Sequence, residues 1–292
     1  MPVNRLAIKK LRELFDPEEV KEILKMSKET EDFEAHWRHL LTGFFNGITE
    51  EVINKFINAE PLKESDLPFD DFFMKHFFEA TRNAFHQTQS PTAATIGRLA
   101  KIPKGKIPKS LNDLMKIWDK YRKSGQMPPH QRTIVNRVRR DYLNKVKSVW
   151  EKYSEPFRTG DNQDKQDIVD RIRRASHSQY ARSKTIVETE TTRYYNQVRK
   201  EIYDQSPDVT HYLFMAIRDM RTTKWCKTRH EVVYTKDTEV FSRETPPIHW
   251  NCRSEILPLT PLNPRHKKII DDQSKRRENR HPEPLPKGWV AG

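Results

Sequence analysis

Cysteine, glycine and long hydrophobic runs are all scarce in this sequence. Only two cysteines occur in 292 residues, Cys226 and Cys252, which excludes a framework of disulfide bonds. The eight glycines form no glycine-rich loop of the kind that binds phosphate in many α/β enzymes. No run of about 18 apolar residues occurs, so we expect no membrane-spanning helix. The first residues also lack the apolar stretch of a signal peptide. These absences favour a helix-rich protein that is made in a reducing cytoplasm.

Positive charge is what the sequence has in excess. The formal net charge is +13, the pI is about 9.6 and the mean hydropathy is -0.92. Residues 98–150 alone contain fifteen lysines and arginines but only three aspartates. Lys and Arg neutralise phosphates and release counterions, so this zone predicts binding to double-stranded DNA without sequence preference. A solvated surface or an acidic protein partner fits the charge equally well. The candidate DNA-binding residues are Lys104, Lys106, Lys109, Arg132, Arg137, Arg139, Arg140 and Lys145.

Apolar spacing predicts helices over most of the chain. Stripes at steps of three and four run from Phe33 to Phe56 and from Phe69 to Phe85, and we expect these aromatic stripes to be core. Long helices follow from about residue 131 to residue 204. Short apolar runs at 211–217, 232–234 and 254–259 predict strands. The fold class is therefore mostly α with a small C-terminal α+β module and an elongated helical N-terminal part.

Changes in composition divide the chain into five predicted regions. The N-terminal helical region spans residues 1–97, and a basic linker with a short helix spans 98–130. Long helices occupy 131–206 and lead into the small α+β module at 207–262. Residues 263–292 contain many charges, four prolines and few apolar residues, so we expect a disordered basic tail.

Two pairs of cysteine and histidine residues form the main candidate site. Cys226-x3-His230 is followed by His249-x2-Cys252. Thiolate and imidazole are the usual zinc ligands, and two close pairs separated by a loop predict a structural zinc site. With all four ligands bound, no position remains for a catalytic water. The alternative is two buried thiols and two hydrogen-bonded histidines.

The segment from Arg182 to Asn196 predicts a helix with a polar face. Glu190, Arg193 and Asn196 lie near one another at helical spacing, which indicates polar contacts to a packed partner element. The pair Glu188-x-Glu190 is also found in ADP-ribosyltransferases, but residues two apart on a helix point in different directions. His249-Trp250-Asn251 partly resembles an HNH nuclease motif, yet a predicted strand rather than a helix follows it.

Two blocks of sequence resemble the Mu F-like family of phage minor head proteins, also called head morphogenesis proteins. The first is IVETETTRYYN, from Ile186 to Asn196, and the second is PPIHWNCR, from Pro246 to Arg253. Between them, Arg218-Asp219 and Arg221-Thr222 lead to Cys226. The resemblance covers about residues 181–259, and Ser254 stands where many members have a cysteine. The residues that match the family motif are Thr189, Glu190, Thr191, Arg193, Asn196, Asp219, His249, Cys252 and Arg253.

This resemblance implies a structural, non-enzymatic protein inside the head of a tailed phage, assembled in the bacterial host cytoplasm. The implied partners are the portal protein, capsid or scaffold proteins and packaged DNA, with a role in head assembly or DNA delivery. The basic zone is consistent with a position facing DNA. The alternative from another class is a metal-dependent nuclease or transferase that acts on DNA.

Overall fold

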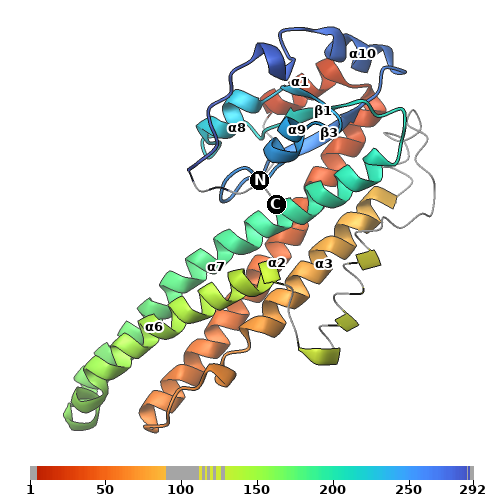
Figure 1. Cartoon of the computed structure of the whole chain (residues 1–292). Helices are drawn as coiled ribbons and strands as arrows, with labels where there is room; N and C mark the ends of the chain where they lie inside the picture. Colours follow the sequence, from red (N-terminus) through yellow and green to blue (C-terminus); the bar gives the residue numbers. More distant parts are fainter. Residues whose placement is uncertain are drawn as a thin grey trace. The chain divides into compact units, whose positions relative to one another are not determined.

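The computed structural model describes residues 5–89, 112–113, 116, 119–120, 123–125, 129–287 and 289. It confirms a mostly helical chain with a small C-terminal α+β module (Figure 1). The helices are α1 (Arg5–Leu14), α2 (Pro17–Ile57), α3 (Phe69–Gln89), α6 (Pro129–Thr159), α7 (Asn162–Asp204), α8 (Lys224–Arg229), α9 (Glu239–Glu244) and α10 (Pro264–Asp271). The strands are β1 (His211–Met215), β2 (Val233–Thr235) and β3 (Glu255–Leu259), and the 3-10 helices are η1 (Glu64–Asp66) and η2 (Arg277–Asn279).

The chain divides into two units that do not follow the predicted order of regions. The first, called here the sheet unit, contains Met1–Glu34, Phe77–Met115 and Glu188–Gly292, and the second, the helical unit, contains Ala35–His76 and Lys116–Val187. Helices α2, α3 and α7 each contribute residues to both units. The N-terminal 34 residues therefore belong with the C-terminal module, although sequence analysis placed them in a separate helical region.

The sheet unit is built on three antiparallel strands in the order β2-β1-β3. The central strand β1 pairs Leu213 with Val233 on one side and with Leu257 on the other. Side chains alternate between the faces of a strand, and β1 follows this rule. Leu213 and Met215 face one core cluster, whereas Tyr212 and Phe214 face the other. The sheet is therefore buried on both faces, and the predicted strand positions are confirmed.

The N-terminal helices supply the core on one face of this sheet. Pro17 stands at the first position of α2, where its missing N–H costs nothing, and the Asp16 N–H donates to Glu19 Oε2 at 3.0 Å. This start sets the angle between α1 and α2. The apolar residues that it brings against Leu213, Val233, Leu257 and Ile269 are Leu11, Leu14, Phe15, Val20, Ile23 and Met26.

Residues 263–287 differ from the expected disordered tail, because they fold against the sheet unit. Ile269 of α10 is buried in the same core cluster as Phe15. The Val233 N–H donates to the Lys275 carbonyl at 2.8 Å, and Arg280 donates to the His230 carbonyl at 3.1 Å. Composition predicted disorder because apolar residues are few. The order comes instead from one buried isoleucine and from hydrogen bonds to backbone carbonyls, neither of which composition reveals.

The helical unit buries much of the aromatic stripes that the sequence predicted as core. Phe45 packs edge-on against Tyr142, with ring centroids 6.0 Å apart. Phe69 packs tilted against the same ring, with centroids 5.5 Å apart. His76 lies in the same stripe, 4.7 Å from the Trp37 ring, and complete burial lowers its pKa to about 3. His76 is therefore a neutral core residue at neutral pH. Among the described helices, none has a stretch apolar and long enough to cross a membrane.

Candidate metal centre and the helix that positions it

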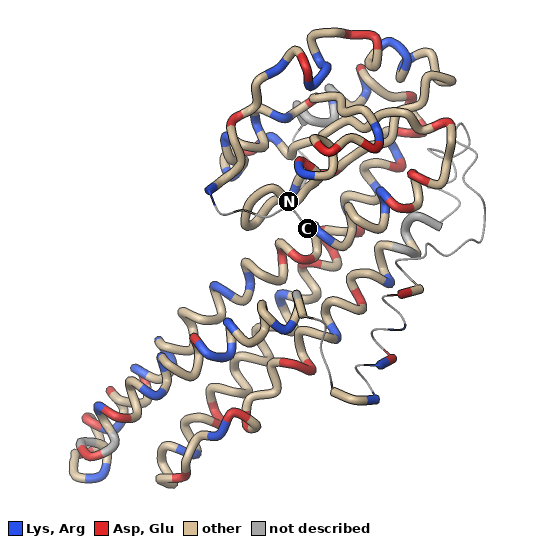
Figure 2. The backbone as a smooth tube through the Cα atoms, in the orientation of Figure 1, with Lys and Arg blue, Asp and Glu red and all other residues tan. Residues whose placement is uncertain are grey.

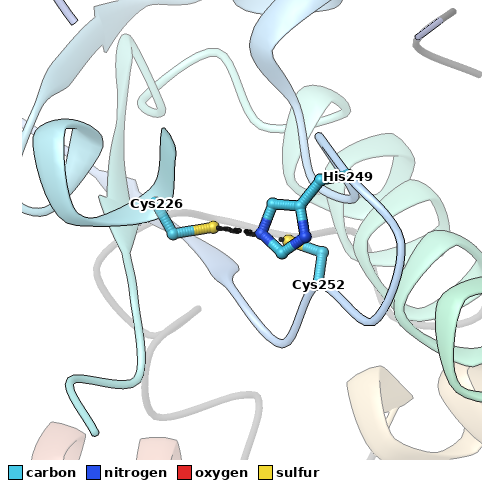
Figure 3. A group of neighbouring side chains, drawn as sticks. All are labelled: Cys226, His249 and Cys252. Atoms are coloured by element: carbon cyan, nitrogen blue, oxygen red, sulfur yellow. Dashed lines mark hydrogen bonds between the residues drawn. The ribbon is translucent and has the colours of Figure 1, made fainter. Parts of the chain in front are cut away.

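Three of the four predicted ligands come together in the sheet unit (Figure 3). Cys226 lies on α8, and His249 and Cys252 lie on the loop before β3. All three are buried, and their ligand atoms lie within 4.8 Å of one another. Asn251, between the two loop ligands, has a φ of 57°, a left-handed conformation that asparagine tolerates better than most residues. This turn returns the chain so that His249 and Cys252 both reach Cys226.

The spacing of these atoms fits a tetrahedral zinc ion. Two sulfurs that each lie about 2.3 Å from one tetrahedral zinc are about 3.8 Å apart, and Cys226 Sγ and Cys252 Sγ are 3.7 Å apart. A disulfide would need about 2.0 Å. His249 Nε2 lies 3.0 Å from Cys226 Sγ, so the distance between these two atoms would increase by roughly half an ångström if both bound zinc. The donor set therefore suits a metal ion with little rearrangement.

The shared hydrogen bonds of the cluster shift the pKa values of its three members in different directions. A hydrogen bond with Cys252 is the largest cause that raises the pKa of Cys226, and burial adds to it. Burial raises the pKa of Cys252, but hydrogen bonds from Cys226 and His249 outweigh it and hold that pKa well below its usual range. Burial lowers the pKa of His249, and its contacts with Cys252 reverse this and raise it. The lowered pKa of Cys252 favours its thiolate, the form that binds metals, whereas Cys226 and His249 would each release a proton when a metal binds.

His230, the fourth predicted ligand, does not lie in the cluster, and this part of the prediction is wrong. Helix α8 ends at Arg229, and His230 has left helical geometry with a ψ of 127°. The spacing of four from Cys226 therefore does not place the two side chains on one face. Instead, the Ala216 N–H donates to His230 Nδ1 at 3.3 Å, and His230 Nε2 lies 3.6 Å from Glu231. His230 helps to close the turn between α8 and β2.

Helix α7 holds the loop that carries two of the ligands. The Asn251 N–H donates to Thr189 Oγ1 at 2.9 Å, and Thr192 Oγ1 donates to the Cys252 carbonyl at 2.6 Å. Asn196 donates to the Ser254 carbonyl and accepts from the Ile256 N–H, each at 3.0 Å. Thr189, Thr192 and Asn196 are spaced by three and four residues, so they share one face of α7. These three residues are called here the clamp of α7. The predicted polar contacts from this helix to a partner element are confirmed.

The other motif residues extend the same support. Glu190 is buried and pairs with Arg193 at 3.2 Å, and Thr191 is also buried. Asp219 accepts from Arg253 at 2.7 Å, and this bond is the main reason that the pKa of Asp219 falls to about 2. The Asp219 carboxylate also accepts from the Arg221 N–H at 2.9 Å. It therefore ties the loop after β1 to the loop before β3.

Sequence analysis missed three residues that contact the centre. Thr192 belongs to the clamp, Thr223 Oγ1 lies 2.8 Å from His249 Nε2, and Ser254 Oγ donates to Cys226 Sγ at 3.1 Å. Helical spacing from Thr189 and Asn196 was a sufficient signal for Thr192. Thr223 carried no such signal, because only the fold brings it to the imidazole, whereas Ser254 stands where many members of the resembled family have a cysteine.

The two enzyme motifs considered from the sequence lack their usual surroundings here. Glu190 is 1% exposed and faces Arg193 inside α7, so Glu188-x-Glu190 does not form a pair of accessible carboxylates. His249-Trp250-Asn251 lies on a loop that leads into β3 rather than into a helix, as the sequence predicted. The polar residues of both motifs act in packing and hydrogen bonding within the sheet unit.

The candidate DNA-binding residues of α6 belong to the helical unit, and one of them, Arg139, is mostly buried in ion pairs. Arg132, Arg137, Arg140 and Lys145 are exposed, and Figure 2 shows basic residues recurring along α6. Arg139 is different, because its guanidinium forms ion pairs with Glu64, at 3.2 Å, and with Asp70, and is only 13% exposed. The sequence does not reveal these distant acidic partners, which hold the Arg139 guanidinium and leave it less accessible than the other candidates. Lys104, Lys106 and Lys109 lie outside the described residues.

Comparison with known protein families finds a match, which covers part of the chain. Residues 148–257 match the model of the family described as phage Mu protein F like protein. The match begins within α6, covers α7 with its clamp residues and all three members of the Cys/His cluster, and ends in β3. It starts earlier than the stretch of resemblance noted from the sequence. No curated protein and no solved structure matches the chain.

Proposed function

Because residues 148–257 form a phage Mu protein F like domain, which points to a phage head morphogenesis protein, we propose that the chain is a structural minor component of a tailed-phage head. In this role it associates with the portal protein or the inner capsid surface and aids head assembly or DNA delivery. The observation that best supports a structural role is the clamp of α7. The family motif residues Thr189 and Asn196 bond to backbone groups of a neighbouring loop instead of lining a reactive cleft.

Particle composition tests this proposal directly. We expect the protein in purified DNA-filled heads, with chemical cross-links from its exposed lysines to the portal or capsid protein, both detected by peptide mass spectrometry. Complete heads that assemble without it and deliver their DNA normally would contradict the proposal. Infection with a phage that lacks the gene is the matched comparison, and we expect defective heads or heads that fail to deliver their DNA.

The exposed face of α6 is the proposed contact to packaged DNA. Arg137, Arg140 and Lys147 are exposed and lie on one side of the helix at spacings of three and seven. Three exposed cations on one side of a helix can neutralise backbone phosphates, and they offer no pattern for reading bases.

Binding to duplex DNA should depend steeply on salt. With roughly four phosphate contacts, we expect affinity to fall about a hundredfold between about 50 and 200 mM salt, without sequence preference. Changing Arg137, Arg140 and Lys147 to Glu should reduce the logarithmic salt slope by about 3. Fluorescence anisotropy measures both effects.

The matched control for this variant changes three exposed cations of the sheet unit, Lys21, Lys227 and Arg243, to Glu. It alters the net charge equally and should retain most of the binding. Equal losses of DNA affinity in the two variants would show that binding depends only on the overall charge of the protein. Plasmid DNA should stay intact during incubation, and nicking would favour a nuclease.

We also propose that Cys226, His249 and Cys252 hold a zinc ion that stabilises the loop before β3. The ion would link α8 to this loop, as structural zinc does in small modules. Purified protein should contain about one zinc per chain by elemental analysis. Cys252→Ser should abolish this zinc, and His230→Ala should keep it, because His230 bonds to Ala216 instead. Less than about 0.2 zinc per chain in the unaltered protein would reject the site.

A further inference from the structure

The described part of the chain supplies three ligands to the Cys/His cluster and no fourth His, Cys, Asp or Glu within the same 4.8 Å. His230 is committed to the turn beside Ala216. The Asp219 carboxylate is held by Arg253, by the Thr222 hydroxyl at 3.1 Å and by the Arg221 N–H. Zinc in proteins is usually four-coordinate, so a metal bound here needs one more donor.

A small cavity lies beside the cluster and opens between the two loops. Cys226 and His249 line it together with residues of the loop after β1 and the loop before β3. Its volume is about 10 Å³, which is close to the space that one water molecule needs. The other lining residues are Ile217, Arg221, Thr222, Thr223, Asn251, Arg253 and Ser254.

The chemistry of this cavity suits a small polar or anionic molecule. Arg221 is exposed at the cavity, while Arg253 is half-buried in its ion pair with Asp219. Thr223 Oγ1 and Ser254 Oγ already contact His249 and Cys226, and hydroxyl groups are not usual zinc ligands. Two cysteines and one histidine with an exchangeable fourth position are a known donor set of zinc proteins that bind a water or a substrate.

We propose that the fourth coordination position of this centre is taken by an exchangeable small ligand from solution, a water or a monodentate anion, that enters through the cavity beside Arg221. The inference rests on the proposed metal site and changes it from a closed site to an open one. The four-ligand set expected from the sequence would be closed, whereas three ligands beside a cavity form an open site. The sheet unit then contains a metal centre that can bind a ligand besides stabilising a loop.

Cobalt substitution tests this inference on the full-length protein, because the visible absorption of Co²⁺ reports its ligands. We expect one bound Co²⁺ to show sulfur-to-metal charge transfer from the two cysteines. Adding azide or thiocyanate should then shift its visible bands in a saturable way. In Arg221→Ala the same shift should need an anion concentration about fivefold higher, because the charge at the entrance is lost. Lys227→Ala, an exposed cation on α8 that does not line the cavity, is the control and should respond like the unaltered protein.

The outcomes distinguish failure of the open fourth position from failure of the metal site itself. Stoichiometric cobalt with a spectrum that does not respond to either anion would overturn the open position and leave the metal site standing. Absence of bound cobalt and zinc would overturn the metal site and the inference together. His230→Ala distinguishes the remaining case. If this variant alone gains the response to anions, His230 is the fourth ligand and the inference is wrong.

Discussion

Replacing Phe15 with alanine is expected to lower the free energy of unfolding by about 3–5 kcal/mol. Phe15 is 2% exposed, lies in the core cluster of the sheet unit and packs edge-on against His266 with ring centroids 5.3 Å apart. Its removal would leave a cavity between the N-terminal helices and α10, where the surrounding backbone is held by hydrogen bonds. Arg265, for example, donates to the Phe15 carbonyl at 3.0 Å. Urea denaturation followed by circular dichroism measures the change.

The control is Arg12→Ala, an exposed position on α1 three residues before Phe15, which should change stability by less than about 0.5 kcal/mol. Deletion of residues 1–15 should be more damaging than Phe15→Ala, because it also removes Leu11 and Leu14 from the core. A loss below about 1 kcal/mol for Phe15→Ala would contradict the packing of the N-terminal helices onto the sheet. In that case the C-terminal module would be stable without them.

Asn196→Ala should cost about 2–4 kcal/mol and weaken zinc binding at the same time. Asn196 is 1% exposed, and its amide group bonds to the Ser254 carbonyl, the Ile256 N–H and the Thr192 carbonyl. Alanine removes these partners, and a buried backbone group without a partner costs about 1–3 kcal/mol. The loop with His249 and Cys252 would also lose its anchor to α7. Thermal unfolding and elemental analysis of the same samples measure the two effects.

Two further variants distinguish this mechanism from a general loss of packing. Gln197→Ala changes the adjacent exposed residue of α7 and should leave both stability and zinc content close to those of the unaltered protein. Asn196→Asp keeps an acceptor for the Ile256 N–H but loses the donor to the Ser254 carbonyl, so we expect an intermediate loss. Equal effects of Asn196→Ala and Asn196→Asp would show that the donor is the decisive half of the clamp.

The clamp gives a physical explanation for part of the family motif. Thr189, Thr192 and Asn196 satisfy backbone groups of one loop, and that loop carries two of the three candidate ligands. The threonine and asparagine side chains on this face of α7 therefore position the loop before β3. This explains how residues that resemble a reactive set in the sequence serve a structural purpose in the fold.

Local patterns in the sequence were sufficient for the elements themselves. Period-3.6 stripes marked the long helices, and short β-rich runs marked β1, β2 and β3 close to their observed bounds. Helical spacing also placed Glu190, Arg193 and Asn196 on neighbouring positions. These features depend on residues fewer than about ten positions apart, so the sequence itself records them.

The tertiary structure alone decided which distant segments meet. It placed Phe15 and Ile269 in one core, paired Arg139 with Glu64, and separated His230 from the Cys/His cluster by ending α8 at Arg229. Each of these outcomes depends on where the chain turns and on contacts between residues far apart in sequence. Periodicity and composition contain no record of such contacts. The sequence therefore determined the helices, strands and candidate ligands, and the tertiary structure determined that three of those ligands meet beside an open cavity.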